Sequence, residues 1–297
     1  MKRVHTQVLH WYKKNGRSLP WRKTTSPYRV LVSEIMLQQT QVGRVVDFYH
    51  QWLRRFPTIS ALARASKPEV LRQWSGLGYN NRAVRLHRLA QIIVDQYGGR
   101  LPSSLEELQR LPGIGKYTSH AISCFAFRKA MPVVDVNIRR IITRMMKRVR
   151  NSSEIKMDRE VWNSAKQLLP AGDAYNWNQA LMDIGSEICT ARNPHCIQCP
   201  LRGACRSAFS DAFQRKFVLR KRNEPSFDGV PRRLIRGKIL KALHAEPLEF
   251  SRLSAIVSHG KDKRFEQFLR LTISQMELDG LVTQLGRGKH IRVAIAV

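Results

Sequence analysis

The sequence is short of acidic side chains and of long apolar runs, and both shortages exclude classes of protein. It has 22 aspartates and glutamates against 52 lysines and arginines, a formal net charge of +30. No apolar run approaches the roughly 18 residues that a membrane span needs, and the start of the chain lacks the apolar core of a signal peptide. We therefore expect no membrane association and a cytoplasmic, nucleoid-associated protein. Its partner should be a polyanion, most often nucleic acid, with anionic lipid as the alternative.

Cysteine is also scarce, and four of the five cysteines lie close together in the sequence. Cys189, Cys196, Cys199 and Cys205 have the spacing C-x6-C-x2-C-x5-C. Disulfides are disfavoured without a secretion signal, and zinc is a second alternative. The unequal spacing favours a [4Fe–4S] cluster, which needs thiolates from several directions. Because the sequence has no flavin or nicotinamide motif, a structural and DNA-contacting role is favoured over redox catalysis.

Strand-like alternation is almost absent before residue 205, so the first part of the chain is predicted to be all helical. One helix is expected over residues 28–40, with Ser26 as its N-cap and Pro27 in its first turn. GLGYNN at 76–81 should separate a helix that starts near Lys67 from one over 82–97. Ser104 and Glu107 form one of two possible capping boxes for a helix over 105–111.

The last part of the chain has a different pattern. Helical runs at 234–244, 248–257 and 265–279 precede two strands at 281–285 and 290–295. Three helices and a β-ribbon are typical of a winged helix, whose third helix usually enters a DNA groove; a winged helix that binds protein is the alternative. We predict a mainly α core over 1–207, a basic linker over 208–230 and a winged-helix-like α+β domain over 231–297.

The most informative local stretch is the turn between two helices at residues 112–115. Pro112, Gly113, Ile114 and Gly115 allow a tight turn with positive φ, and Lys116 follows. Free backbone N–H groups then begin the second helix and would form an anion site for a DNA phosphate. An ordinary helical hairpin is the alternative.

Glu34 lies on the predicted helix over 28–40, where apolar neighbours leave almost no polar face. Such a helix is buried, and burial disfavours the charged form of a carboxyl group. We therefore predict an elevated pKa for Glu34. A buried glutamate that an arginine or the backbone satisfies is the alternative.

Asp135 follows Val133 and Val134 and could cap a helix that begins near Val136. A capped carboxylate stays ionised, so the sequence offers one acid in an apolar site and one anion. This pair suits cleavage of an N-glycosidic bond, because one group protonates the leaving base while the other stabilises a cationic sugar.

Together these features resemble a helix-hairpin-helix DNA glycosylase, and over roughly residues 5–207 the chain resembles the MutY-type adenine glycosylases. The stretches that carry the resemblance are LPWR (19–22), SEIMLQQTQV (33–42), GLGY (76–79), LPGIGKYT (111–118), VDVN (134–137), NQALMDIG (178–185) and the four-cysteine loop. The hairpin and the cysteines alone would also fit enzymes like endonuclease III.

The resemblance implies a role for several residues at the reacting base. Glu34 would protonate adenine at N7, Asp135 would stabilise the cationic sugar, and Asn137 would help to position it. Tyr117 stands where relatives with lyase activity keep a nucleophilic lysine, so a monofunctional glycosylase without β-lyase activity is expected. Lys116, the neighbour of Tyr117, should meet phosphate together with Gly113 and Gly115.

Further residues match positions that hold the distorted duplex. Gln39 and Tyr79 match side chains that wedge into the strand opposite the extruded base, where they offset part of the cost of flipping. Trp21, Arg22 and Gln179 match residues near the extruded base. The implied substrate is double-stranded DNA with a mismatched or damaged base, bound by a monomer.

Two departures from the family pattern leave the excised base open. The family usually has glycine where this chain has Val136, and its C-terminal MutT-like domain, which reads 8-oxoguanine, is not recognisable here. Adenine opposite guanine or 8-oxoguanine is the favoured substrate, and thymine or uracil opposite guanine is the alternative. A non-catalytic iron–sulfur regulator with a winged helix is the alternative from another class, although a pure binder needs no buried acid.

Overall fold

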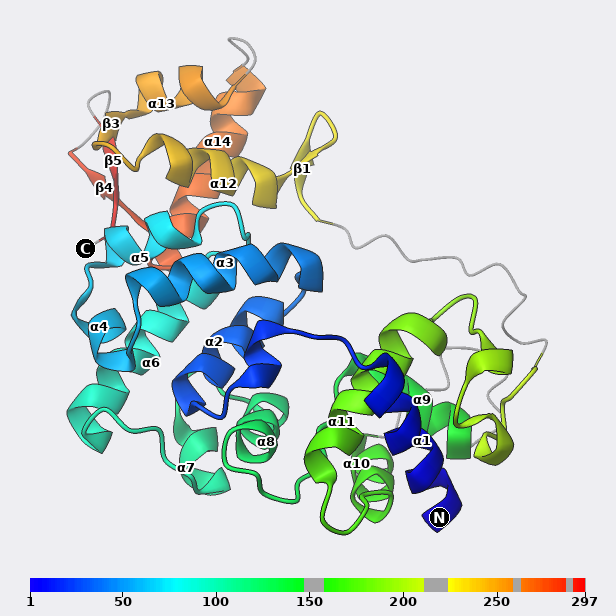
Figure 1. The fold of residues 1–297 in the computed structure, drawn as a ribbon. Helices are drawn as coiled ribbons and strands as arrows, with labels where there is room; N and C mark the ends of the chain where they lie inside the picture. Colours follow the sequence, from blue (N-terminus) through cyan, green and yellow to red (C-terminus); the bar gives the residue numbers. More distant parts are fainter. Residues whose placement is uncertain (147–157, 211–223, 259–262, 287–290, 297) are drawn as a thin grey trace. The chain divides into compact units, whose positions relative to one another are not determined.

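The computed structural model describes residues 1–146, 158–210, 224–258, 263–286 and 291–296, and Figure 1 shows that they are mostly helical. The chain packs as two compact units whose segments alternate along the sequence. The first unit comprises residues 1–31, 103–110 and 114–220, and the second comprises 32–102, 111–113 and 221–297. Among the described residues, no helix is long and apolar enough to cross a membrane.

In the described part of the chain, six complete helices and several short helical turns belong to the first unit. The helices are α1 (Lys2–Asn15), α7 (Leu105–Arg110), α8 (Lys116–Phe125), α9 (Val136–Met146), α10 (Asp158–Gln167) and α11 (Ala174–Asp183). Its core gathers apolar side chains from α9, α10 and α11, among them Ile141, Trp162 and Trp177. The turns are η1 (Pro20–Lys23), η3 (Ile184–Ile188), η4 (Cys196–Gln198) and η5 (Arg202–Ala204).

The second unit begins with a helical layer around buried aromatic side chains. Its helices are α3 (Val42–Arg55), α4 (Ile59–Arg64), α5 (Lys67–Trp74) and α6 (Asn81–Tyr97), with the C-terminal part of α2 (Pro27–Leu37). Trp52 contacts Phe56 and Trp74 edge to face, with ring centroids 4.9 and 5.3 Å apart. Such pairs stabilise a core beyond the area they bury.

The C-terminal part of the second unit is a small α+β module. Its elements are β1 (Ser226–Phe227), β2 (Val230–Pro231), α12 (Arg232–Ala242), β3 (Leu248–Glu249), α13 (Phe250–Val257), α14 (Lys263–Leu278), β4 (Val282–Leu285) and β5 (Arg292–Ile295). The antiparallel sheet has the order β3-β5-β4, with Leu248 opposite Val293 and Val282 opposite Ile295. The predicted fold class, a mainly helical core with a small α+β C-terminal module, is confirmed.

Local sequence signals account for most element boundaries. The Ser26 hydroxyl accepts from the N–H of Arg29 at 3.5 Å, and that of Ser104 accepts from Glu107 at 3.3 Å, as expected for N-caps. The α2 helix ends at Leu37 rather than at residue 40, because Gln39 takes a positive φ of 56°. Residues 226–231, of which 226–230 were expected within a linker, form the β1–β2 hairpin, since Asp228 and Gly229 adopt the left-handed turn conformation.

Candidate active site and cluster loop

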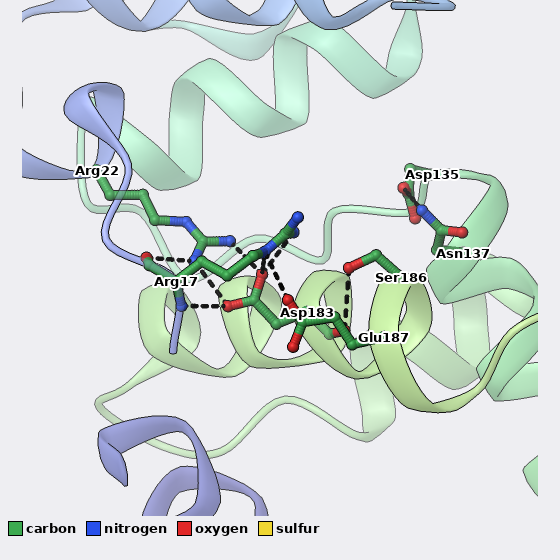
Figure 2. A network of polar contacts seen from close by, with 7 residues as sticks. All are labelled: Arg17, Arg22, Asp135, Asn137, Asp183, Ser186 and Glu187. Carbon is green, nitrogen blue, oxygen red and sulfur yellow. Dashed lines mark hydrogen bonds and ion pairs between the residues drawn. The ribbon is translucent and has the colours of Figure 1, made fainter. Parts of the chain in front are cut away.

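Asp135 lies directly before α9 and is held by the first turn of that helix. The backbone N–H of Ile138 donates to Asp135 Oδ1 at 2.7 Å, and Asn137 Nδ2 donates to Asp135 Oδ2 at 3.0 Å. Figure 2 shows the Asp135 and Asn137 side chains turned toward each other. The structure therefore brings two of the predicted site residues together, with the carboxylate fixed by a backbone cap and a side-chain amide.

Burial raises the pKa of Asp135 above its ordinary value. The hydrogen bonds from Ile138 and Asn137 and the charge of Arg140 lower this pKa again, but they do not outweigh the loss of solvation. Helix capping alone predicts a lowered pKa for Asp135, whereas its pKa is raised. The sequence reveals the cap but not how deeply the capping side chain is buried. A positive charge that develops beside Asp135 would stabilise its ionised form.

Arg140 connects this pair to the cysteine loop. Its Nη2 donates to Asn137 Oδ1 at 2.9 Å and to the carbonyl of Gly185 at 2.6 Å, and its Nε donates to the carbonyl of Cys189 at 2.7 Å. A Cβ at Gly185 would lie 2.6 Å from Asn137 Cβ. Glycine is therefore required at 185 for η3 to approach α9 this closely.

Asn178 is a positioning residue that the sequence pattern did not single out. It is 2% exposed, its Oδ1 accepts from the N–H of Val133 at 3.0 Å, and its Nδ2 donates to the carbonyl of Met131 at 2.9 Å. Asn178 thus pins the extended segment that leads to Asp135. Its place in the NQALMDIG stretch was the only available signal.

Arg22 was expected near the extruded base, and the structure places it in an ion-pair network with Asp183. Its Nη1 and Nη2 donate to the two Asp183 oxygens at 2.7 and 2.8 Å, and Arg17 Nε donates to Asp183 Oδ1 at 2.7 Å (Figure 2). The Asp183 side chain is fully buried. Burial raises the pKa of Asp183, but hydrogen bonds and charge from Arg22 and Arg17 lower it by a larger amount. The net shift of this pKa is therefore downward.

Trp21 and Gln179, the other residues expected near the base, are also in the first unit. Trp21 in η1 is 7% exposed and Gln179 in α11 is 5% exposed. Tyr117 lies in the first turn of α8 and is half-buried. The sequence roles of these three residues stay predictions.

Glu34 lies in the part of α2 that belongs to the second unit. It is 5% exposed, and Leu31, Val32 and Ile35 beside it are buried, as the apolar pattern predicted. The burial of Glu34 thus agrees with the sequence pattern, while its role as the proton donor stays a prediction.

The buried Arg82 organises the loops that follow α2 and α5. It donates to the carbonyls of Met36 at 2.8 Å, Gln38 at 2.5 Å and Gly78 at 2.9 Å. Burial lowers its pKa to about 10, which leaves the side chain protonated at neutral pH. Arg82 therefore ties the end of Glu34's helix to the GLGY loop, a role that the sequence pattern did not reveal.

Gln39 and Tyr79, the predicted wedge residues, line the same groove of the second unit. Both take positive φ angles, 56° and 50°, which are uncommon for residues other than glycine and are found at functional sites. Tyr79 is 46% exposed, so its ring is open to a ligand. The structure thus brings these two predicted residues together.

The hairpin between α7 and α8 has the expected turn. Gly113 has a φ of 82°, which favours glycine, and Gly115 immediately precedes α8. Lys116, expected to meet phosphate, is exposed at the start of α8 with its Nζ 4.3 Å from the centre of the Trp162 ring. The phosphate-binding roles of Gly113, Gly115 and Lys116 stay predictions.

The four loop cysteines have the surroundings of a cluster site. Burial and the charges of Cys189, Cys205 and Cys196 raise the pKa of Cys199 to about 12, so a bound metal group would be needed to hold this side chain as a thiolate. Arg144 Nη1 lies 3.3 Å from Cys189 Sγ and anchors the loop through the carbonyls of Thr190 and Ala191. Among the described residues no three ligands converge on a single metal ion; a cluster of separated irons needs no such convergence.

Comparison with known families defines the class of protein. Residues 32–167 match the HhH-GPD superfamily of base excision DNA repair proteins, and residues 189–205 match the iron–sulfur binding domain of endonuclease III. The fold is similar to a thermostable thymine-DNA glycosylase, with a TM-score of 0.64, 31% identity and coverage of 70% of this chain and 97% of that chain. The fold and site are therefore those of an iron–sulfur helix-hairpin-helix DNA glycosylase, and the predicted [4Fe–4S] cofactor is confirmed.

The curated relatives identify the family. The adenine DNA glycosylase of Mycobacterium tuberculosis (strain H37Rv) is 35% identical over 298 residues, which cover 95% of this chain and 94% of the relative. The human adenine DNA glycosylase is 40% identical over 209 residues, 67% of this chain and 38% of the human protein. The chain belongs to the adenine DNA glycosylase family.

Proposed function

We propose that this protein hydrolyses the N-glycosidic bond of adenine mispaired with guanine or 8-oxoguanine in duplex DNA. We place it in the cytoplasm at the nucleoid, acting as a monomer. The observation that carries the proposal is Glu34, a carboxyl group only 5% exposed and flanked by the buried apolar side chains of Leu31, Val32 and Ile35. This acid occurs in a chain that is 35% identical to an adenine DNA glycosylase over 94% of that relative.

In the proposed reaction Glu34 donates its proton to N7 of adenine, which makes the base a better leaving group. As the glycosidic bond breaks, positive charge develops on the sugar. Asp135, oriented by Asn137 and the N–H of Ile138, stabilises this charge by electrostatics or by a transient bond. Water then completes hydrolysis at the sugar carbon. The [4Fe–4S] cluster, when bound, folds the loop that presents basic side chains to DNA.

Strand cleavage is not part of the proposed reaction. Tyr117 stands where a nucleophilic lysine would form a Schiff base with the sugar, and a phenol cannot form that imine. The expected product is an abasic site in an intact strand, which breaks only after treatment with alkali.

Excision of thymine or uracil opposite guanine is a second candidate function. Val136, directly after Asp135, is 75% exposed and replaces the glycine that the adenine-directed pattern favours. The solved structure of a thymine-DNA glycosylase is 31% identical to this chain. Glu34 favours adenine instead, because purine N7 offers a basic atom to protonate.

The direct test is incubation of the purified protein with duplexes that carry adenine, thymine or uracil opposite guanine or 8-oxoguanine. We expect alkali-dependent breaks at adenine, and a preference for thymine or uracil would support the second candidate. Glu34→Gln should reduce single-turnover excision by about 10²–10⁴-fold, as for loss of a general acid, and leave duplex binding unchanged.

The matched control is Glu69→Gln, the same change at a glutamate of α5 that pairs with Arg55. It should excise as the unmodified protein does. Full excision by Glu34→Gln would remove the acid assignment. Tight duplex binding without any excision by the unmodified protein would instead favour a non-catalytic regulator.

A further inference from the structure

The basic helix of the C-terminal module is α12, not the third helix that winged-helix proteins usually place in DNA. In its 11 residues α12 has five basic side chains and no acidic one. The third helix, α14, has three basic and two acidic side chains in 16 residues. Its exposed positions include Leu271 at 59% and Leu278 at 83%. Charge therefore favours α12 as the surface for a polyanion.

The same α12 helix lines a groove beside the wedge residues, and all of these residues belong to the second unit. The groove, of about 740 Å³, is lined by residues 39–41 and 75–80 and by Gly237, Lys238 and Lys241 of α12. We call it the wedge groove. A helix with net positive charge thus lies next to Gln39 and Tyr79.

Two hydrogen bonds join the C-terminal module to the helical part of the second unit. Arg236 Nη2 donates to Asn81 Oδ1 at 3.2 Å and to Asp279 Oδ2 at 2.6 Å. Arg72 Nη2 donates to the carbonyl of His244 at 3.0 Å. Asn81 is only two residues from Tyr79, and both Tyr79 and α12 line the wedge groove.

A glycine inside α12 is a separate indication that a ligand approaches this helix closely. Gly237 lies in the middle of the helix, where glycine costs about 0.5–1 kcal/mol relative to alanine. A Cβ at Gly237 would meet no heavy atom within 4 Å, so packing within the described structure does not require the glycine. Its position on the wedge groove instead allows close approach of a bound backbone.

We propose that α12 is the DNA-contacting helix of the C-terminal module and that it binds phosphates of the strand opposite the excised base. This inference rests on the proposed function, because the wedge residues identify that strand. The chemistry is that of a phosphodiester backbone: Lys238 and Lys241 supply positive charge, and Gly237 supplies room. The module would thereby hold the unflipped strand while the core acts on the other.

The test measures the affinity of the full chain for a fully paired duplex and for an A·G duplex over a range of salt concentrations. Lys241→Glu should weaken binding on the order of tenfold and reduce the slope of log Kd against log salt by about 1. Gly237→Leu, which changes no charge, should weaken binding by filling the groove while keeping the thermal stability of the helix. Lys263→Glu is the matched control at an exposed position of α14 and should leave affinity unchanged.

The contacted strand is identified by replacing single phosphates with neutral methylphosphonates. A replacement opposite the adenine that weakens binding of the unmodified protein should have no further effect on Lys241→Glu. Loss of affinity in Lys263→Glu alone would show that α14 is the DNA helix. Unchanged affinity in all three variants would show that the module does not contact DNA, and either result overturns the proposal. Binding to a fully paired duplex needs no excision, so failure of the proposed function would be seen separately.

Discussion

In each of the two units a buried arginine side chain fixes segments near the candidate site residues. Both terminal nitrogens of Arg22 donate to the carboxylate of Asp183, whereas Arg82 donates mainly to backbone carbonyls. A buried ion pair adds little net stability, but removal of one partner leaves an uncompensated charge. At the residue scale, substitution of Asp183 should therefore be costly.

Asp183→Asn should lower the free energy of unfolding by about 3 kcal/mol, because Arg22 would stay buried without its counter-charge. Urea denaturation at neutral pH measures this change. Glu187→Gln is the control, since Glu187 pairs with the same Arg17 at 3.5 Å but is 45% exposed. Its effect should stay below about 1 kcal/mol, and equal effects of the two variants would contradict the account.

The pH dependence of stability should reflect the lowered pKa of Asp183. Its folded-state pKa lies below the unfolded value of about 3.9, so its stabilisation is complete above that value. The stabilisation is lost as the pH falls through the folded pKa. Asp183→Asn should therefore remove part of the acid sensitivity seen in unfolding curves below about pH 4.

The contribution of Asp135 to stability should change with pH in the opposite direction to that of Asp183. Its pKa is raised by burial, so its contribution to stability is lost as the pH rises through the folded value. Asp135→Asn should thus unfold at a higher urea concentration than the unmodified protein at neutral pH, since asparagine also caps helices well. The same variant should lose excision. A variant that is both less stable and fully active would contradict the role of Asp135.

At the scale of elements, η3 and α9 make the closest approach at the site. Gly185 has no room for a side chain, because its Cβ would lie 2.6 Å from Asn137 Cβ, and Asn137 in turn holds Asp135. The contact between η3 and α9 therefore fixes the Asp135 carboxylate indirectly, through Asn137.

Gly185→Ala should shift Asn137 and reduce the single-turnover rate more than the affinity for DNA. The overpacking should lower stability by about 1–3 kcal/mol. Gly203→Ala is a matched control, because a Cβ at Gly203 would meet nothing within 4 Å. An unchanged rate for Gly185→Ala would show that the position of Asn137 does not limit the reaction.

At the scale of the whole molecule, the cluster loop and the candidate site share one arginine. Arg140 bonds both to Asn137 and to the carbonyl of Cys189, while Arg144 fixes the loop through Thr190 and Ala191. The cluster loop is thus supported by α9, the helix that begins directly after Asp135. Loss of the cluster should loosen the loop before it disturbs the second unit.

Removal of iron by a chelator should weaken duplex affinity before it alters the excision rate of bound substrate. Loss of visible absorbance follows the cluster, and fluorescence anisotropy follows DNA binding. Cys196→Ser should behave in the same way, whereas Cys124→Ala, a cysteine outside the loop, should keep both iron and affinity. Unchanged binding by cluster-free protein would refute a DNA-contacting role of the loop.

Much of the fold could be predicted because its signals are local. Ser26, Ser104 and Asp135 cap the helices that the sequence assigned to them, and Gly113 makes the expected turn. The hairpin at Asp228 and Gly229 was missed because a basic, polar segment lacks the alternation that marks a strand. The end of α2 was placed three residues late, because the positive φ of Gln39 depends on Arg82, which is distant in the sequence.

The candidate site could be predicted in its residue types but not in its supports. Asn178, Arg140 and Arg82 act on backbone groups dozens of residues away, and no spacing rule reveals such partners. The position of α12 beside the wedge groove could not be predicted either, because the sequence shows the charge of the helix but not the groove.

The sequence by itself determined the residue types of the candidate site: a carboxyl group on a mostly apolar helix, a capped carboxylate, a glycine turn and four cysteines in one loop. These features depend on residue type and on spacing within a few turns of the chain, which local physics settles. Only the tertiary structure decided the raised pKa of Asp135, the pairing of Arg22 with Asp183 and the helix that faces the wedge groove. Solvation and long-range hydrogen bonds exist only after distant segments have packed, so no local pattern can contain them.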